Sequence, residues 1–155
     1  ITGGLGGDTI DGGASQDSIK YTLGNSESQV TSLSSYDVVD PQDGNDKIVA
    51  TGTTLIKGSF TAQTQTTTDI TNSSDLLSAL TEVSNAGTSA LVDNEAYLIT
   101  DITDSGDGQQ AGDYLVIESG DNTSTVDSND EVIQLLGNPT DFSINSGDAV
   151  IDTFA

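Results

Sequence analysis

The side chains of this sequence that could do chemistry are mostly carboxylates, and the best-patterned of them follow glycines near the beginning. Residues 3–11 read Gly-Gly-Leu-Gly-Gly-Asp-Thr-Ile-Asp, and residues 12–20 read Gly-Gly-Ala-Ser-Gln-Asp-Ser-Ile-Lys. Both stretches follow the nonapeptide G-G-x-G-x-D-x-U-x, where U is a large aliphatic residue, except that Ser15 replaces one glycine. Two adjacent copies argue against ordinary Gly-Asp turns, which would be the alternative interpretation.

These residue types suit a calcium ion, which takes six to eight oxygen ligands from carboxylates, carbonyls and water. Glycine can adopt a positive φ, so a glycine-rich loop can curl its carbonyls around an ion. The aspartates add charged oxygens at the loop ends. The ligands predicted at this end of the chain are Gly4, Gly6, Asp8, Gly13, Ser15 and Asp17.

The repeats resemble those of the RTX (repeats-in-toxin) family of secreted bacterial calcium-binding proteins. Ile1, Ile10 and Ile19 keep the same nine-residue spacing, so we expect an array that began before Ile1. In short strands these isoleucines would point inward and stack. The resemblance implies a parallel β-roll in which each ion lies between successive turns. With only two repeats, the sites at Asp8 and Asp17 would be half-sites completed by neighbouring coils.

Composition points to a protein whose stability depends on calcium. The 155 residues carry 25 acidic and 3 basic side chains, a net charge of −22, and 20 of the acidic residues are aspartate. Self-repulsion of this charge opposes compaction unless cations neutralise it. Nucleic acid is excluded as a partner because its phosphates need Lys and Arg, and membrane insertion is excluded because no apolar run approaches about 20 residues.

Export is predicted from the resemblance rather than from a signal peptide. RTX relatives leave the cell through a type I exporter that reads a C-terminal signal. The apolar, acidic tail at 148–155 has that style, although a simple terminal strand explains it equally well. We therefore expect a secreted, extracellular or cell-surface protein.

The fold is predicted to be mainly β, with short RTX parallel β-roll turns followed by a small antiparallel β domain carrying one packed helix. The division is predicted as 1–22 for the end of the roll and 23–155 for a capping and secretion-signal domain. Apolar residues recur at helical spacing after Asn72, which predicts a helix near 74–86. Strands are predicted around 47–60, at 96–100, 113–117 and 131–136, and near 148–154.

Three acidic loops are further candidates for ion binding. The first, around Asp43 and Asp46, repeats the end of the nonapeptide, but Asp46 is out of phase with Asp8 and Asp17, and a plain hairpin turn is the alternative. The other two loops lie between predicted strands, where a solvated hairpin end is the alternative. Their candidate ligands are Asp104, Asp107, Asp121, Asp127 and Asp130.

No catalytic constellation is present, so we predict that the chain is not an enzyme. Cysteine and histidine are absent, which removes thiol nucleophiles and imidazole bases. The predicted function is a calcium-binding structural or assembly module of a bacterial surface protein, such as an S-layer, filament or matrix component. It would fold on meeting external calcium and associate with neighbouring copies. The second acidic loop between strands resembles C-terminal segments of cyanobacterial surface proteins.

Two alternatives remain open. The chain could be the non-catalytic C-terminal RTX module of a larger extracellular enzyme or toxin. A carbohydrate-binding module is less favoured, because most of the few aromatic residues lie within predicted strands.

Overall fold

A computed structural model describes residues 1–23, 27–41, 46–51, 56–57, 69–86, 95–119, 125–137, 139, 142–144 and 150–154. The protein is mainly β, as predicted, with one helix in the described residues. The elements are β1 (Thr9–Asp11), β2 (Ser18–Thr22), β3 (Asp37–Asp40), β4 (Lys47–Thr51), β5 (Ile56–Lys57), α1 (Ser73–Ala86), β6 (Glu95–Ile102), β7 (Gly112–Ile117), β8 (Glu131–Leu135), β9 (Phe142–Ile144) and β10 (Val150–Phe154).

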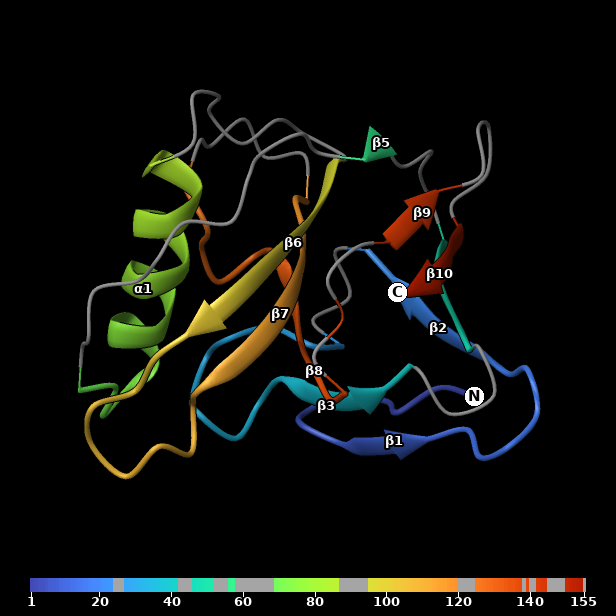
Figure 1. Ribbon diagram of the computed structural model, residues 1–155, viewed down its shortest axis with the longest axis horizontal. Helices are drawn as coiled ribbons and strands as arrows, with labels where there is room; N and C mark the ends of the chain where they lie inside the picture. The colour runs from blue at the N-terminus through green and yellow to red at the C-terminus, as the bar shows by residue number, and fades with distance from the viewer. Residues whose placement is uncertain are drawn as a thin grey trace.

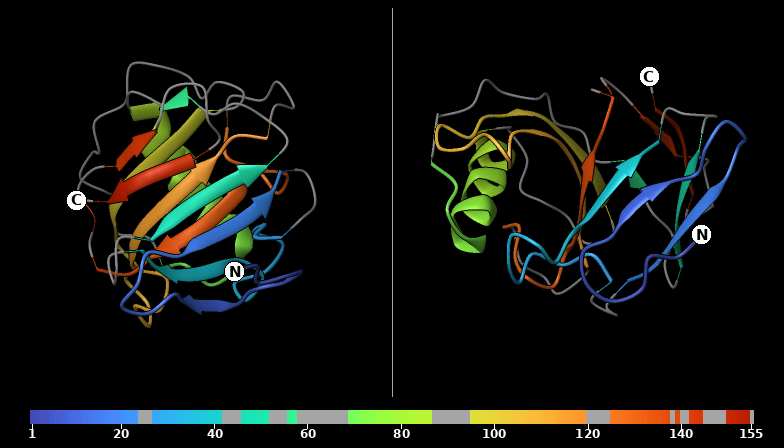
Figure 2. Two further views of the ribbon diagram at one scale, coloured as in Figure 1. Left: turned by 90° about the vertical axis from the view of Figure 1, so that its right-hand side faces the viewer. Right: turned by 90° about the horizontal axis from the view of Figure 1, so that it is seen from below.

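The elements form three layers (Figure 1). The first sheet has the strand order β1-β3-β8-β7-β6-β5, and the second sheet has the order β2-β4-β10-β9. One buried apolar cluster fills the space between the two sheets, and another lies between the first sheet and α1. The first sheet is therefore the middle layer, with α1 on one face and the second sheet on the other (Figure 2).

The first four strands alternate between the two sheets. β1 pairs in parallel with β3 in the first sheet, and β2 pairs in parallel with β4 in the second. Both pairings have the same offset, since Ile10 faces Val39 and Ile19 faces Ile48. The chain thus makes two successive coils around a shared interior.

Ile1 pairs in the same parallel manner with β2 of the second sheet. Its amino group donates to the carbonyl of Ser18 at 2.6 Å, and its carbonyl accepts from the N–H of Lys20 at 2.8 Å. This is the bonding of a residue that lies parallel beside Ile19, two nonapeptides further along the chain. The coil that follows is longer, since paired residues such as Ile19 and Ile48 are 29 residues apart, whereas Ile1 and Ile19 are 18 apart.

The aliphatic residues of the repeats are buried where their alternation predicts. Ile19, Val39 and Ile48 are fully buried, and Ile10 is nearly so. Burying one such side chain contributes roughly 1.5–3 kcal/mol. Stacking of these residues therefore holds the coils together, but each short repeat supplies only one of them.

Helix α1 begins one residue before the predicted start. The Asn72 side chain accepts from the N–H of Asp75 at 3.2 Å, and the Asp75 carboxylate accepts in return from the N–H of Thr71 at 3.0 Å. The first of these bonds satisfies a free N–H group of the first turn, and the second fixes the residue that precedes Asn72. Leu76 and Leu80 lie on one face and are fully buried against the first sheet.

The sheets differ from the predicted small antiparallel domain. β6, β7 and β8 are antiparallel as expected, but β8 also pairs in parallel with β3. β10 lies in the second sheet, where Ile151 pairs with Ile48, because its inward side chain fills the space between the sheets. The coils extend to β4, past the predicted limit at residue 22, and the division into two domains stays a prediction.

Candidate metal centre

Each of the first two strands is preceded by a glycine-rich loop with left-handed backbone. Gly4 and Gly13 occupy the same place in successive repeats and have φ angles of 104° and 79°. Gly6 has a φ of 93°, whereas its counterpart Ser15 is not among the residues with positive φ. The two loops therefore share their first turn and differ at the substituted position.

The first loop leads to a pair of aspartates, one from each coil. The N–H of Asp8 donates to Oδ1 of Asp37 at 2.8 Å. Oδ2 of Asp37 accepts from the hydroxyl of Tyr21 at 2.8 Å, so both oxygens of this fully buried carboxylate have a partner. A Cβ placed on Gly3 would lie 2.9 Å from Oδ2 of Asp8 and 3.0 Å from Oδ2 of Asp37, so both carboxylates flank the same point.

Burial raises the pKa of Asp37 above its ordinary value, and the neighbouring charges of Asp8 and Glu27 raise the pKa further. The hydrogen bonds from Asp8 and from Tyr21 act in the opposite direction. In the first pair, the buried carboxylate of Asp37 thus receives a hydrogen bond from the protein at each of its oxygens.

The second loop leads to an equivalent pair, in which one carboxylate oxygen lacks a hydrogen-bond partner in the described residues. The N–H of Asp17 donates to Oδ1 of Asp46 at 2.8 Å. Asp46 is fully buried, and its Oδ2 has no hydrogen-bond partner in the described residues. This oxygen points at Gly12, where an added Cβ would overlap it and would also lie 2.9 Å from Cγ of Asp46.

The Asp17–Asp46 pair fits a calcium ion. An unpartnered buried carboxylate oxygen is costly unless a donor or a cation compensates it. Asp46 would supply that oxygen, and Asp17, whose N–H donates to the other oxygen of Asp46, carries a second carboxylate. The Gly12–Gly13 turn brings backbone close without a side chain in the way. No group of three or more Asp or Glu in the described residues forms a metal cluster, so further oxygens would have to come from carbonyls or water.

Sequence spacing was misleading for Asp46. It lies 29 residues after Asp17, which is not a multiple of nine, yet it occupies the equivalent place in the next coil. Asp37 stands at the same offset from Asp8 and was missed entirely. The available signal was the Asp-x-aliphatic triplet at 37–39, which recurs at 46–48.

The hairpin alternative for the first acidic loop is wrong. β3 and β4 lie in different sheets and do not pair with each other, so they are not the two strands of a hairpin. Asp43 itself, like Asp121, lies outside the described residues.

The remaining predicted ligands are not brought to the coils. Asp104 accepts hydrogen bonds from the N–H groups of Ile70, Gly106 and Gln110 at 3.0–3.3 Å, which hold its pKa below the ordinary value. Both oxygens of Asp130 accept from backbone N–H groups, one of them that of Asp127 at 2.8 Å. These carboxylates shape their own loops, and ion binding by them stays a prediction.

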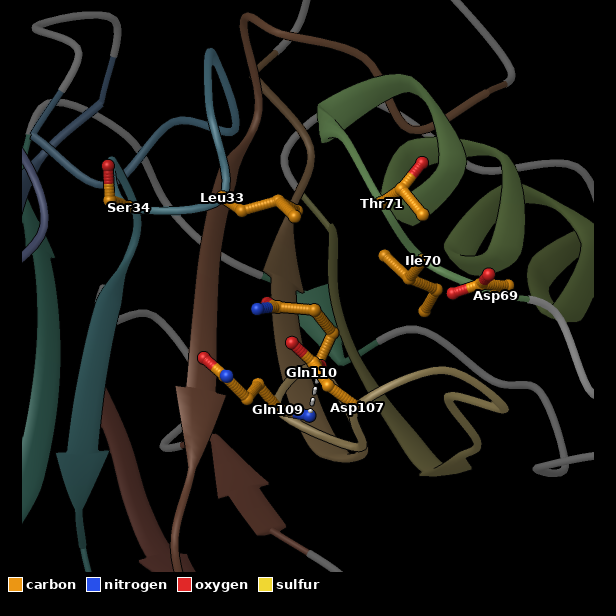
Figure 3. Close-up of a pocket in the computed structure, with 8 residues that line it drawn as sticks. All are labelled: Leu33, Ser34, Asp69, Ile70, Thr71, Asp107, Gln109 and Gln110. Carbon is orange, nitrogen blue, oxygen red and sulfur yellow. Dashed lines mark hydrogen bonds between the residues drawn. The ribbon is translucent and has the colours of Figure 1, made fainter.

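Asp107 lines a cavity of about 600 Å³ beside the start of α1 (Figure 3). Its Oδ1 accepts from the N–H of Gln109 at 3.0 Å, and Gln110 lies beside it. Among the described residues, the lining combines acidic, amide and hydroxyl groups with apolar side chains and contains no basic residue. It is therefore unsuited to an anionic ligand. Its residues are Leu33, Ser34, Asp69, Ile70, Thr71, Asp107, Gln109 and Gln110.

Comparisons of the chain with family models, with curated proteins and with solved structures found no match. In the part of the chain that the structure describes, no helix is long and apolar enough to cross a membrane.

Proposed function

We propose that this chain is a calcium-binding structural module of a secreted bacterial surface protein, in which the first coils are the end of an RTX-type β-roll. The observation that carries the proposal is Oδ2 of Asp46, a fully buried carboxylate oxygen without a hydrogen-bond partner. It lies against a glycine and beside a second aspartate, as a cation ligand would.

Three further features support the proposal. The tandem nonapeptides precede strands that alternate between two sheets, and Ile1 pairs beside Ile19 one two-repeat turn later. Equivalent aspartates of successive coils lie side by side, so an ion there would join one coil to the next. The net charge of −22 would be reduced by each bound cation.

Calcium binding would make folding conditional on the medium. An ion that binds only the folded state adds its binding free energy to folding, about 2.7 kcal/mol at one hundred times the dissociation constant. In cytosol with little calcium, the acidic chain would stay unfolded for a type I exporter. At millimolar calcium outside the cell, it would fold.

Assembly into an S-layer, filament or matrix would use the sheet edges. β1 and β5 are the edge strands of the first sheet, and β2 and β9 those of the second. An edge strand offers unpaired backbone groups to a strand of a neighbouring copy. Thr51 to Thr68, a threonine-rich stretch with few charges that is a candidate for such an edge, lies mostly outside the described residues.

The proposal is tested by circular dichroism of the whole chain in EGTA and after addition of calcium. We expect a large gain of β signal and a higher melting temperature with calcium, and a weaker response to magnesium, which prefers a stricter octahedral shell. Circular dichroism spectra and a melting temperature that are the same in EGTA and in calcium would rule the proposal out.

A further inference from the structure

The cavity beside the start of α1 continues toward the first glycine loop. A second cavity of about 270 Å³ shares four of its lining residues, which are Leu33, Ser34, Gln109 and Gln110. The second cavity also reaches Tyr36 and Asp8. The larger cavity, of about 600 Å³, has the size of a small-molecule site, which is typically about 300–1,000 Å³. The two adjoining cavities are called the groove below.

Gln110 is the polar side chain of the groove that the protein holds most firmly. Its Oε1 accepts from the hydroxyl of Tyr36, and its backbone carbonyl accepts from the hydroxyl of Tyr114 at 2.7 Å. Both tyrosines are buried, and their rings pack edge to face with centroids 6.0 Å apart. Gln110 itself is only 8% exposed. The packed tyrosines therefore set the orientation of a nearly buried amide.

This orientation leaves the amide donor of Gln110 for a ligand. Since Oε1 receives the hydroxyl of Tyr36, the other end of the amide is Nε2, which carries two N–H donors. Nε2 makes no hydrogen bond to the described residues, and it is not one of their buried unpartnered atoms. Because Gln110 lines both cavities, this donor is accessible from the groove. A ligand bound there must offer an acceptor.

The other polar groups of the groove select for a neutral ligand that also donates. Asp69 and Asp107 carry carboxylates, Gln109 carries an amide, and all three are exposed. An anion would meet these carboxylates without a basic residue among the described lining. An ammonium group has three donors and no acceptor, so it would leave Nε2 of Gln110 without a partner.

Apolar side chains complete the match to a sugar. Figure 3 shows Leu33 on one side of the larger cavity, Ile70 on the other, and Gln110 between them. A sugar ring carries apolar C–H groups together with hydroxyls, each of which can donate and accept. A peptide is a poorer match, because an extended peptide binds most readily along the edge of a sheet. The described residues of the larger cavity all lie outside the strands.

We propose that the groove binds a short, neutral saccharide. Nε2 of Gln110 donates to a sugar oxygen, while Asp69 and Asp107 accept from sugar hydroxyls. Leu33 and Ile70 pack against the C–H groups of the ring. The site uses hydrogen-bonding groups rather than an exposed aromatic ring, so the scarcity of aromatic residues does not argue against it. It is separate from the proposed calcium pair and adds a second activity to the module.

The test is binding of the whole chain to an array of neutral oligosaccharides of glucose, galactose, mannose and N-acetylglucosamine, beside acidic ones that carry uronate or sulfate. Saturating calcium is present, so the result does not depend on whether folding needs the ion. We expect binding to neutral members only. Calorimetry of a bound saccharide should then show about fivefold weaker binding by Gln109→Ala, which loses one exposed amide. Gln16→Ala is the matched control, since Gln16 is also exposed but does not line the groove, and its affinity should be unchanged.

Gln110→Glu tests the oriented donor. It keeps an acceptor for the hydroxyl of Tyr36 and replaces the N–H donors with an oxygen, so binding should weaken more than about tenfold. Nuclear magnetic resonance of the unchanged, nitrogen-15-labelled protein needs no variant to fold. The side-chain NH₂ signals of Gln109 and Gln110 should shift on addition of the saccharide, and that of Gln16 should not.

Several results would overturn the saccharide site. They are an array without a bound neutral saccharide, a preference for acidic members, or equal affinity of Gln109→Ala and Gln16→Ala. Shifts of the Gln110 side-chain signals by spermidine or by an unrelated peptide, but not by the saccharide, would assign the groove to that other class of ligand instead.

Discussion

The two aspartate pairs of the coils share one backbone geometry and differ in a single donor. In both pairs, an aspartate N–H donates at 2.8 Å to the aspartate 29 residues later, and that second carboxylate is fully buried. The remaining oxygen of Asp37 receives the hydroxyl of Tyr21, whereas that of Asp46 has no hydrogen-bond partner in the described residues. The first pair is stabilised by the protein itself, and the second is proposed to require a cation.

This comparison shows that two copies of the same sequence motif can lead to carboxylates with different surroundings. Both repeats carry the sequence pattern of a calcium loop, yet a tyrosine that reaches across from the second sheet supplies one of them with a donor. Under the proposed function, the pattern would mark where ions bind, and the packing around each carboxylate would decide how much an ion stabilises it.

The largest effect is expected from adding a methyl group at Gly12. Neither Gly12 nor its counterpart Gly3 has a positive φ, so alanine changes only the space available. At Gly12 the methyl group meets the buried Asp46 carboxylate, and we expect Gly12→Ala to cost about 2–3 kcal/mol and to abolish the calcium response. Urea denaturation with and without calcium measures both effects.

Gly3→Ala is the matched control, because Gly3 is exposed and its methyl group would come no closer than 2.9 Å to Asp8 and 3.0 Å to Asp37, whereas the methyl group at Gly12 would lie 2.3 Å from Oδ2 of Asp46. We expect it to cost less than half as much. Equal losses of stability and of calcium response in Gly12→Ala and Gly3→Ala would show that the two aspartate pairs are equivalent.

A smaller effect is expected when the first pair is converted into the state of the second. Tyr21→Phe leaves Oδ2 of Asp37 without its donor, which should destabilise the calcium-free protein by about 1–3 kcal/mol. Calcium should then restore more stability than it does in the unchanged protein. Thermal melting over a calcium series measures this gain.

Tyr97→Phe controls for the loss of a hydroxyl, since Tyr97 bonds to Glu95 and packs in the other core. Its calcium response should be unchanged. A Tyr21→Phe protein that responds to calcium no more than the Tyr97→Phe protein would argue against the role given to Tyr21.

The smallest effect on calcium is expected in the loop after β6. Asp104→Asn weakens bonds to three backbone N–H groups and should cost roughly 1 kcal/mol. Because these N–H groups already engage both oxygens, the number of bound calcium ions should stay the same. Isothermal titration calorimetry gives that number, and the loss of an ion would instead support the sequence-based assignment of Asp104 as a ligand.

Local pattern was sufficient to predict most elements. Helical spacing of Leu76 and Leu80 placed α1 within one residue, and compact apolar runs placed β6, β7 and β8. Alternation also gave the inward direction of Ile10 and Ile19. These features depend on residues close together in the chain, which is why local sequence patterns predict them.

The site was predictable only in part. Asp17 and the left-handed Gly13 follow from the repeat, but Asp37 and Asp46 join their partners through a 29-residue register that is not a multiple of nine. The donor that distinguishes the pairs, the hydroxyl of Tyr21, comes from the opposite sheet. The pairing of β10 with β4 in the second sheet was also missed, because it depends on contacts between residues far apart in the chain.

The most direct measurement compares the calcium-induced stabilisation of Asp46→Asn with that of Asp37→Asn. Asparagine keeps an acceptor for the aspartate N–H in both variants and removes one charge from each pair. The account predicts that Asp46→Asn loses most of the stabilisation by calcium, while Asp37→Asn keeps more than half of it. Equal losses, or a larger loss in Asp37→Asn, would contradict it.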